Sequence, residues 1–214
     1  DGIMDLKAFN QLSCGLYLIS SAHEGKESGC IVNTVQQVTA EPPQLAVTIN
    51  KNSYTGELIA QSGVFEAAVL SKKVELEQIG RFGFQSGRDV QKFEGISCLR
   101  DKAGVPYVKE GMTARFFCRV TGQMDVGTHR IFVGQVEQAE CLEGESMTYA
   151  YYHQVKKGGT PKEAPSYQGE EKEQPAQNGW RCKICGYVFE GETLPSDFVC
   201  PICKKGPEYM EPLA

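Results

Sequence analysis

The order of apolar and polar residues along the chain predicts several β-strands and only a few short helices. The strand-like runs, rich in β-branched and aromatic residues or alternating in polarity, span residues 13–22, 29–39, 45–49, 64–70, 114–120 and 130–137. Helical spacing is confined to residues 56–61, with Ser53 or Thr55 as the N-cap, and to residues 74–80. Because the strands follow one another without βαβ alternation or internal repeats, we expect a mainly β fold with short helices, most simply an antiparallel barrel.

This pattern stops at residues 168–179, a polar stretch without any apolar anchor. Such a stretch has nothing to bury in a core and is typical of a linker. A chain of 214 residues is long enough for one substantial domain and a small one. We therefore expect a large domain before the linker and a small domain after it.

Composition narrows the class of protein. The net charge of −5 and the lack of a basic patch argue against nucleic-acid binding. No apolar run approaches the length of a membrane span, and no signal-peptide pattern is present. Five of the nine cysteines are scattered through apolar or strand-like surroundings: Cys14, Cys30, Cys98, Cys118 and Cys141. An odd number of such thiols is typical of a reducing compartment, so we expect a cytoplasmic protein.

The other four cysteines form two Cys-x-x-Cys pairs, Cys182/Cys185 and Cys200/Cys203, with fourteen residues between the pairs. Each pair makes a short turn that directs two sulfurs at one point, and two such turns complete a tetrahedron. Sulfur-only tetrahedral ligation suits zinc or iron, and zinc is the general interpretation of the spacing. The sequence therefore predicts one metal ion bound by these four cysteines.

The residues around the cysteines favour iron. Gly186 directly follows Cys185, where a positive φ lets a backbone amide point at a sulfur. The segment also carries a small aromatic core of Trp180, Tyr187 and Phe198. Together the motifs CxxCGY and LPxDFVCPxC resemble rubredoxin, which implies an iron centre. The segment between the pairs is shorter than in free-standing rubredoxins, as in rubredoxin modules fused to other redox proteins, and Lys204 replaces the usual second glycine.

A phosphate site is predicted at the turn Asn50–Thr55, although the chain lacks the glycine-rich motifs of Rossmann and P-loop proteins. The turn leads from a strand into a helix, whose first N–H groups and dipole favour an anion. Ser53, Tyr54 and Thr55 add hydroxyl groups, and Lys51 adds positive charge. By itself the pattern is also that of an ordinary capped helix.

Four separated motifs resemble those of the flavin-reductase-like, FMN-binding split barrels, particularly the flavoredoxin branch, over about residues 5–167. These motifs are Asn33-Thr34, Asn50–Thr55, Lys92-Phe93 and Gly127–Gly134. The resemblance implies a split-barrel domain at 1–167, the linker at 168–179 and a rubredoxin-like domain at 180–214. It also implies FMN contacts from Asn33, Thr34, Asn50, Lys51, Ser53, Tyr54, Thr55, Ser86, Lys92, His129 and Tyr167.

The same resemblance assigns roles to these residues. Ser53 and Thr55 are expected at the FMN phosphate, with Lys92 and Ser86 approaching from the glycine-rich loop at residues 82–89 and the residues directly after it. His129 is the expected catalytic residue, donating to the flavin ring or orienting the nicotinamide, although Thr128 replaces the aspartate of the family's Gly-Asp-His motif. The simpler interpretations are that Lys92 is a solvated surface charge and that His129 is a loop histidine without a ligand.

The order of the two domains resembles the high-molecular-weight rubredoxins. This resemblance implies an oxidoreductase in which a hydride passes from NADH or NADPH to FMN, and single electrons then pass through the iron to an acceptor protein. For this family the implied acceptor is a flavodiiron protein that reduces oxygen or nitric oxide, and the implied assembly is a homodimer. Two alternatives remain. One is a flavin reductase whose four-cysteine domain binds zinc and serves for protein docking, and the other is a flavin-binding module without catalysis.

Overall fold

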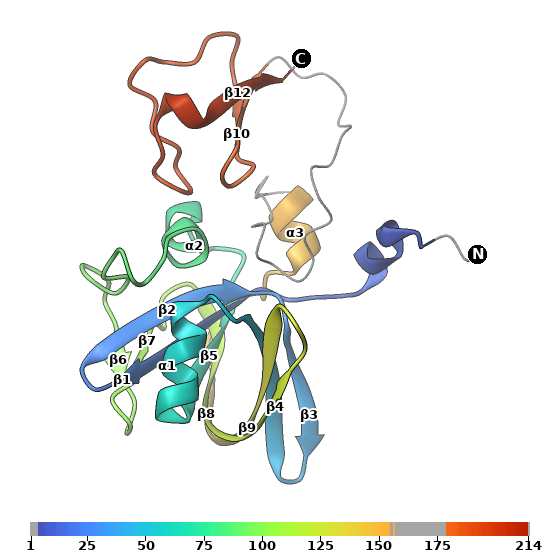
Figure 1. Cartoon of the computed structure of the whole chain (residues 1–214), viewed down its shortest axis with the longest axis vertical. Helices are drawn as coiled ribbons and strands as arrows, with labels where there is room; N and C mark the ends of the chain where they lie inside the picture. The colour runs from blue at the N-terminus through green and yellow to red at the C-terminus, as the bar shows by residue number, and fades with distance from the viewer. Residues whose placement is uncertain (1–3, 155, 157–178, 214) are drawn as a thin grey trace.

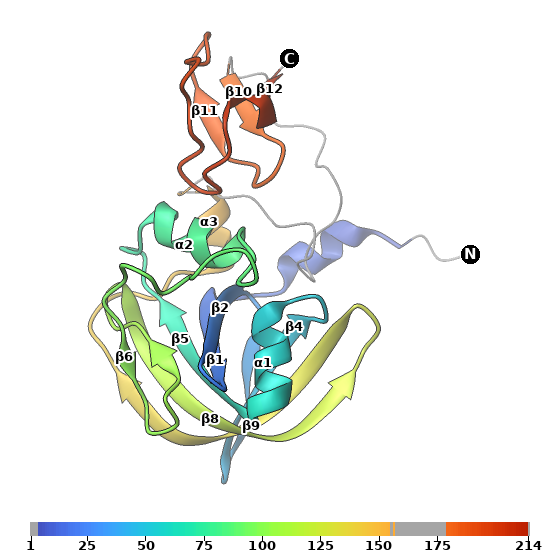
Figure 2. The same ribbon diagram turned by 60° about the vertical axis from the view of Figure 1, so that its left-hand side comes forward.

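The computed structural model describes residues 4–154, 156 and 179–213. Within them the large domain is built on a seven-stranded sheet in which every neighbouring pair of strands is antiparallel. In sheet order the strands are β2 (Lys26–Val32), β1 (Tyr17–His23), β5 (Val64–Leu70), β8 (Met112–Asp125), β9 (His129–Cys141), β4 (Pro43–Asn50) and β3 (Val35–Ala40). The sheet curls strongly on itself (Figures 1 and 2). The predicted mainly β, antiparallel barrel is confirmed.

The long strands β8 and β9 account for much of the curl. Their pairing shifts register between Phe117 and Cys118 and again between Val120 and Gly122, and such bulges increase the local twist of a sheet. On β9, a Cβ atom at Gly134 would lie 2.8 Å from Cε1 of Phe65. A glycine is needed there because the Phe65 ring occupies the space of a side chain.

The run predicted as one strand at 29–39 is two strands, so this prediction is wrong in its continuity. β2 pairs with β1 and ends at Val32, and β3 begins at Val35 and pairs with β4. Between them the Thr34 hydroxyl donates to the carbonyl oxygen of Thr48 at 2.7 Å. The chain therefore changes its pairing partner at Asn33-Thr34, which moves it from one edge of the sheet to the other.

The helices cover the sheet and one end of it. α1 (Tyr54–Ser62) contacts β1 and β2, and α2 (Leu76–Gly83) contacts β2. α2 and α3 (Tyr149–Gln154) bury Ile79, Phe82 and Tyr152 in one hydrophobic cluster with residues of β1 and β5. The shorter elements of this domain are η1 (Leu6–Gln11), β6 (Leu99–Arg100) and β7 (Pro106–Tyr107). None of the helices in the described residues is both long enough and apolar enough to cross a membrane.

The C-terminal segment forms a separate small ribbon. Its three antiparallel strands are β10 (Gly179–Cys182), β11 (Val188–Glu190) and β12 (Met210–Leu213), with η2 (Pro207–Tyr209) before the last one. Figures 1 and 2 place the ribbon against the end of the barrel that carries α2 and α3, with its loops directed toward these helices. The predicted linker and the boundary at residue 167 lie outside the described residues.

Candidate functional site

The four predicted metal ligands converge in the ribbon. The Sγ atoms of Cys182 and Cys203 are 3.5 Å apart, as are those of Cys185 and Cys200, and all four sulfurs lie within 4.8 Å of one another. The cysteines are at most 3% exposed. A tetrahedral ion with metal–sulfur bonds of about 2.3 Å needs sulfur–sulfur distances of about 3.8 Å. The arrangement therefore fits a single iron or zinc ion.

Two equivalent turns produce this geometry. The amide of Gly186 donates to the carbonyl oxygen of Cys182 at 2.8 Å, and the amide of Lys204 donates to that of Cys200 at 3.0 Å. The turns require left-handed backbone at the residue after the second cysteine, with φ of +74° at Gly186 and +60° at Lys204. Hydrogen bonds among the four thiols lower the pKa of Cys182 and raise that of Cys185. All four must lose their protons to bind a metal, because the thiolate is the metal-binding form.

The predicted phosphate site is a well-formed turn at the start of α1. The side chain of Asn50 accepts from the Asn52 amide at 2.8 Å, and the Ser53 amide donates to the Asn50 carbonyl at 3.0 Å. The Ser53 hydroxyl caps the helix by accepting from the Gly56 amide at 3.4 Å. Thr55 is 1% exposed, and its hydroxyl donates to that of Ser28 at 3.1 Å. This geometry serves as a helix cap and also presents amides and hydroxyl groups at one helix end.

A second group of predicted residues lies where β4 meets β9. Asn50 pairs directly with His129, and the Lys51 amide donates to the Thr128 carbonyl at 3.1 Å. His129 is buried, with its Nδ1 atom 2.8 Å from the Thr128 hydroxyl. Lys51 forms an ion pair with Asp125, and hydrogen bonding to this lysine lowers the pKa of Asp125. The sequence predictions missed Asp125, which places a carboxylate beside the motif that lacks the family's aspartate.

Lys92 is a buried residue. It is 4% exposed, and its Nζ atom donates to the carbonyl oxygens of Gly29 at 2.7 Å and Phe82 at 2.8 Å. Burial lowers its pKa to about 8. The thiol of Cys30, whose pKa is raised by burial, interacts with Lys92, Thr55 and Ser53. The interpretation of Lys92 as a solvated surface charge is therefore wrong.

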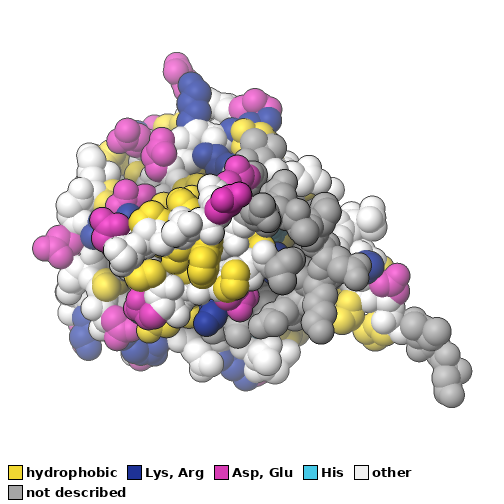
Figure 3. Space-filling view, turned by 90° about the horizontal axis from the view of Figure 1, so that it is seen from above, with side chains coloured by type: hydrophobic (Ala, Val, Ile, Leu, Met, Phe, Trp, Pro, Cys, Tyr) yellow, Lys and Arg dark blue, Asp and Glu magenta, His cyan; other side chains and the backbone are white. Residues whose placement is uncertain are grey.

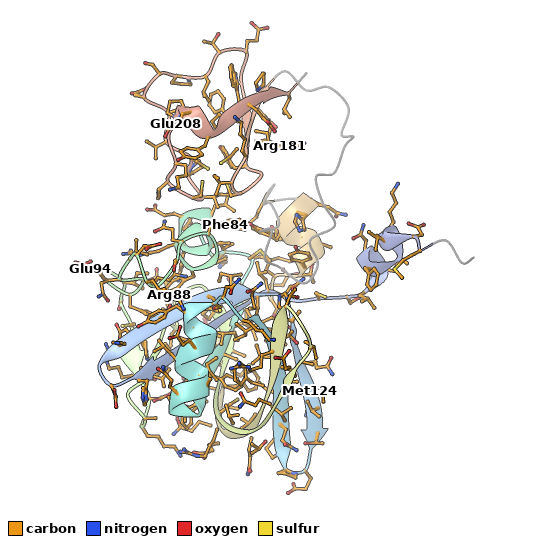
Figure 4. The ribbon with its side chains drawn as sticks, in the orientation of Figure 1. Phe84, Arg88, Glu94, Met124, Arg181 and Glu208 are labelled. Carbon is orange, nitrogen blue, oxygen red and sulfur yellow. The ribbon has the colours of Figure 1, made fainter. Side chains whose placement is uncertain are left out.

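The glycine-rich loop closes over the start of α1. The Ser86 hydroxyl accepts from the Arg88 amide at 3.2 Å, and Arg88 donates to the Asn52 carbonyl at 3.0 Å while forming an ion pair with Glu57. Arg88 also lies over the Tyr54 ring, beside the upper end of α1 (Figure 4). Arg88 was not among the predicted site residues, because only the folded loop brings its guanidinium to the helix.

The structure thus brings together most of the predicted cofactor residues, at one end of α1 and the adjoining ends of β4 and β9. Two of the predicted cofactor residues, Thr34 and Tyr167, are not among those placed at this end of α1. The Thr34 hydroxyl is used by a backbone carbonyl of β4, and Tyr167 lies outside the described residues. The remaining residues present amides, hydroxyl groups and one buried ammonium, which are groups that bind a phosphate and a polar ring.

Each of the two domains matches a known protein family. Residues 9–160 match the flavin reductase like domain, and residues 180–211 match the rubredoxin-like domain of rubrerythrin. The high molecular weight rubredoxin of Moorella thermoacetica is 41% identical, over 97% of this chain and 99% of that protein. The ferric-chelate reductase (NAD(P)H) of Archaeoglobus fulgidus is 42% identical, over 77% of this chain and 98% of that protein.

A solved structure supports the assignment of the barrel. The flavoredoxin of Methanosarcina acetivorans superposes with a TM-score of 0.56 and 26% identity, covering 63% of this chain and 74% of that chain. The barrel is therefore the flavin-binding part of an oxidoreductase, and the cysteine ribbon is its metal-binding part. The chain belongs to the high-molecular-weight rubredoxins, in which a flavin reductase-like split barrel precedes a rubredoxin-like domain.

Proposed function

We propose that the protein is an NAD(P)H-dependent electron-transfer oxidoreductase that passes electrons through FMN and one iron ion to an acceptor protein. The observation that carries this proposal is the contact between the two parts. Leu76 and Phe84 of the flavin reductase-like domain pack against the cluster formed by the four cysteines, Ile202 and Met210. A metal centre held against a flavin-binding domain is suited to receive electrons from it.

In this proposal, separate groups of residues bind FMN, the nicotinamide and the iron. The first amides of α1, that of Thr55 among them, and the hydroxyl group of Ser53 bind the FMN phosphate. An ammonium group has three donors; backbone carbonyls hold two from Lys92, and we assign the third to the flavin. His129 orients the nicotinamide, and Cys182, Cys185, Cys200 and Cys203 hold the iron. When bound, FMN would supply a two-electron hydride acceptor, and the iron a one-electron carrier.

We further propose a flavodiiron protein as the acceptor, a homodimer as the working assembly and the cytoplasm as its location. The ribbon face carries hydrophobic side chains among acidic ones (Figure 3). Its acidic residues Glu190, Glu192, Asp197, Glu208 and Glu211 are exposed. η1 buries none of its residues, and its Leu6 and Phe9 are exposed together with Leu12 at its C-cap. A second copy of the chain that covers these residues would account for their exposure.

Anaerobic rapid mixing tests the electron path. On addition of NADH or NADPH, we expect the flavin absorbance to bleach first and the red colour of the ferric tetrathiolate to fade afterwards. The matched control is Cys185→Ser, which lacks one ligand and should retain only the first phase. Flavin bleaching without loss of the ferric colour in the parent protein would refute the path through iron, and a colourless protein containing zinc would do the same.

A second candidate function is direct reduction of ferric chelates by the barrel. The relative named ferric-chelate reductase (NAD(P)H) aligns over 98% of its own length with 77% of this chain. If the barrel acts alone in this way, Cys185→Ser should reduce a ferric chelate with NADH as fast as the parent protein. Loss of that activity in the variant would place the ribbon in the path.

A further inference from the structure

The ribbon touches α2 through three kinds of contact. Leu76 and Phe84, near the two ends of the helix, pack against the cysteine cluster, and Phe84 lies just beneath the ribbon (Figure 4). Glu77 forms an ion pair with Lys204, with an Nζ–Oε1 distance of 2.9 Å. Gly80, midway along α2, faces Ile202, which is fully buried. In the sequence Ile202 stands between the ligands Cys200 and Cys203. The second cysteine turn is therefore seated on the helix.

Gly80 makes this close approach possible. A Cβ atom there would lie 1.6 Å from the carbonyl oxygen of Ile202 and 2.4 Å from its carbonyl carbon. Both are backbone atoms, so rotation of a side chain cannot relieve the overlap. At Gly83, on the same helix, a Cβ atom would make only ordinary contacts with Ile31, at 3.4 Å and beyond. Glycine disfavours a helix relative to alanine, so the need for glycine at position 80 comes from the ribbon.

Lys204 provides an independent observation on the same turn. Its φ of +60° is a left-handed conformation that is costly for a residue with a Cβ atom, whereas the equivalent position in the first turn is Gly186. A glycine at 204 would remove that cost but could not reach Glu77. The strained lysine thus contributes a contact between the two domains that the usual glycine cannot make.

The opposite side of α2 faces the barrel core and Lys92, one of the predicted flavin residues. Ile79 and Phe82 are buried in the barrel core, and the Phe82 carbonyl accepts from Lys92. One helix, about 10–12 Å across with its side chains, therefore lies between the second cysteine turn and Lys92. Residues on its two sides contact the metal-binding turn and the candidate flavin site.

We propose that α2 is the docking platform for the metal-binding end of the ribbon, and that Gly80 is a positioning residue for electron transfer to the iron. This inference rests on the proposed function. The iron that Cys182, Cys185, Cys200 and Cys203 would hold could take only one electron at a time from reduced FMN, going from Fe(III) to Fe(II). The acceptor protein would have to oxidise it again before the second electron could follow. Gly80 takes no part in that chemistry; it sets the distance over which each electron moves.

The test compares Gly80→Ala with the matched control Gly83→Ala in the complete, iron-loaded protein. Because Gly80→Ala favours the helix but prevents the seated arrangement, we expect unchanged flavin reduction by NADH. The rate of iron reduction should fall by about tenfold or more, which corresponds to about 1.4 kcal/mol of activation free energy. Gly83→Ala should match the parent in both phases. Equal iron reduction in Gly80→Ala would overturn the proposal, whereas no iron reduction in the parent would overturn the proposed function.

A readout independent of electron transfer is amide hydrogen exchange of residues 76–84 and 200–204. Gly80→Ala should increase exchange in both segments, and Gly83→Ala should not. Glu77→Lys and Lys204→Glu, each alone, should shift exchange in the same direction by a smaller amount, because exposed ion pairs are weak; the double exchange should restore protection. Unchanged exchange in Gly80→Ala, or no restoration in the double variant, would contradict docking through these residues.

Discussion

At the scale of single residues, Glu66 combines burial with two opposing neighbours. It is 1% exposed, and its Oε1 atom accepts from Arg115 at 2.5 Å. Its Oε2 atom and Oδ2 of Asp101 are buried without a hydrogen-bond partner in the part of the chain that the structure describes. A proton shared between the two carboxyl groups would satisfy both oxygens. Burial, opposed by Arg115 and reinforced by Asp101, raises the pKa of Glu66 to about 8.

This carboxyl group predicts a pH dependence of stability. An unfolded glutamate has a pKa of about 4.3, so between that value and about 8 only the folded state keeps the proton. Raising the pH through this window should therefore destabilise the fold, by at most about 1.4 kcal/mol per pH unit. Glu66→Gln, which cannot ionise, should lack this slope in urea unfolding measured across the window. Parallel slopes for the two proteins would show that Glu66 is ionised in the folded state.

Ser53 allows the helix cap to be separated from the cofactor. Ser53→Ala should lose about 1 kcal/mol of stability with the cap. Ser53→Asp should keep the cap, yet raise the FMN dissociation constant by about tenfold or more, because it adds a negative charge beside the proposed phosphate. Urea unfolding and flavin fluorescence titration measure the two effects. If Ser53→Asp bound FMN with the parent's affinity, the FMN phosphate could not be bound at this turn.

At the scale of elements, the strands were largely predictable because alternation is local. Val64–Leu70 is a strand at the predicted residues, and the strands predicted at 114–120 and 130–137 are extended at both ends in β8 and β9. The prediction of a single strand at 29–39 was wrong because a change of pairing partner does not alter the pattern of apolar and polar residues. α2 begins and ends later than predicted, since Phe82 is held by the barrel core rather than by the local pattern.

The packing of β8 and β9 predicts that alanine substitution will cost different amounts of stability at two glycines, Gly134 and Gly122. Gly134→Ala should destabilise the fold by about 1–3 kcal/mol through overpacking, because its Cβ would lie 2.8 Å from the Phe65 ring and 2.9 Å from Cβ of Cys118. Gly122→Ala on β8 is the control, because among the described residues no atom outside Gly122 and its two chain neighbours lies within 4 Å of its Cβ position. Denaturant unfolding compares the two. A Gly122→Ala variant that loses as much stability as Gly134→Ala would contradict the packing argument.

At the scale of the whole molecule, the two domains draw their stability from different sources. The barrel buries large apolar clusters, whereas the ribbon's cluster consists mostly of the cysteines themselves. A unit of this size depends on its metal, which contributes about 10–16 kcal/mol of apparent binding free energy in small zinc domains. The ribbon should therefore unfold without metal while the barrel persists.

Metal removal by a chelator, or Cys200→Ser, tests this difference. The chain has one tryptophan, Trp180 in the ribbon, so its fluorescence reports on that domain alone. We expect a red shift of Trp180 emission after metal loss, with the β-sheet circular dichroism and flavin binding of the barrel retained. Cys141→Ser, which changes an exposed cysteine outside the ribbon, should leave the emission unchanged. Unfolding of both domains together would mean that the barrel depends on the ribbon.

The sequence by itself determined the metal site, because four cysteines at short spacings need only local turns to converge. It also determined the strand content, because alternation in polarity reflects the two faces of each strand. Only the tertiary structure decided that Lys92 is buried, that Asp125 lies beside Lys51 and that Gly80 admits the backbone of Ile202. Each of these contacts joins residues far apart in the chain, and no local pattern records which distant surface a residue will meet.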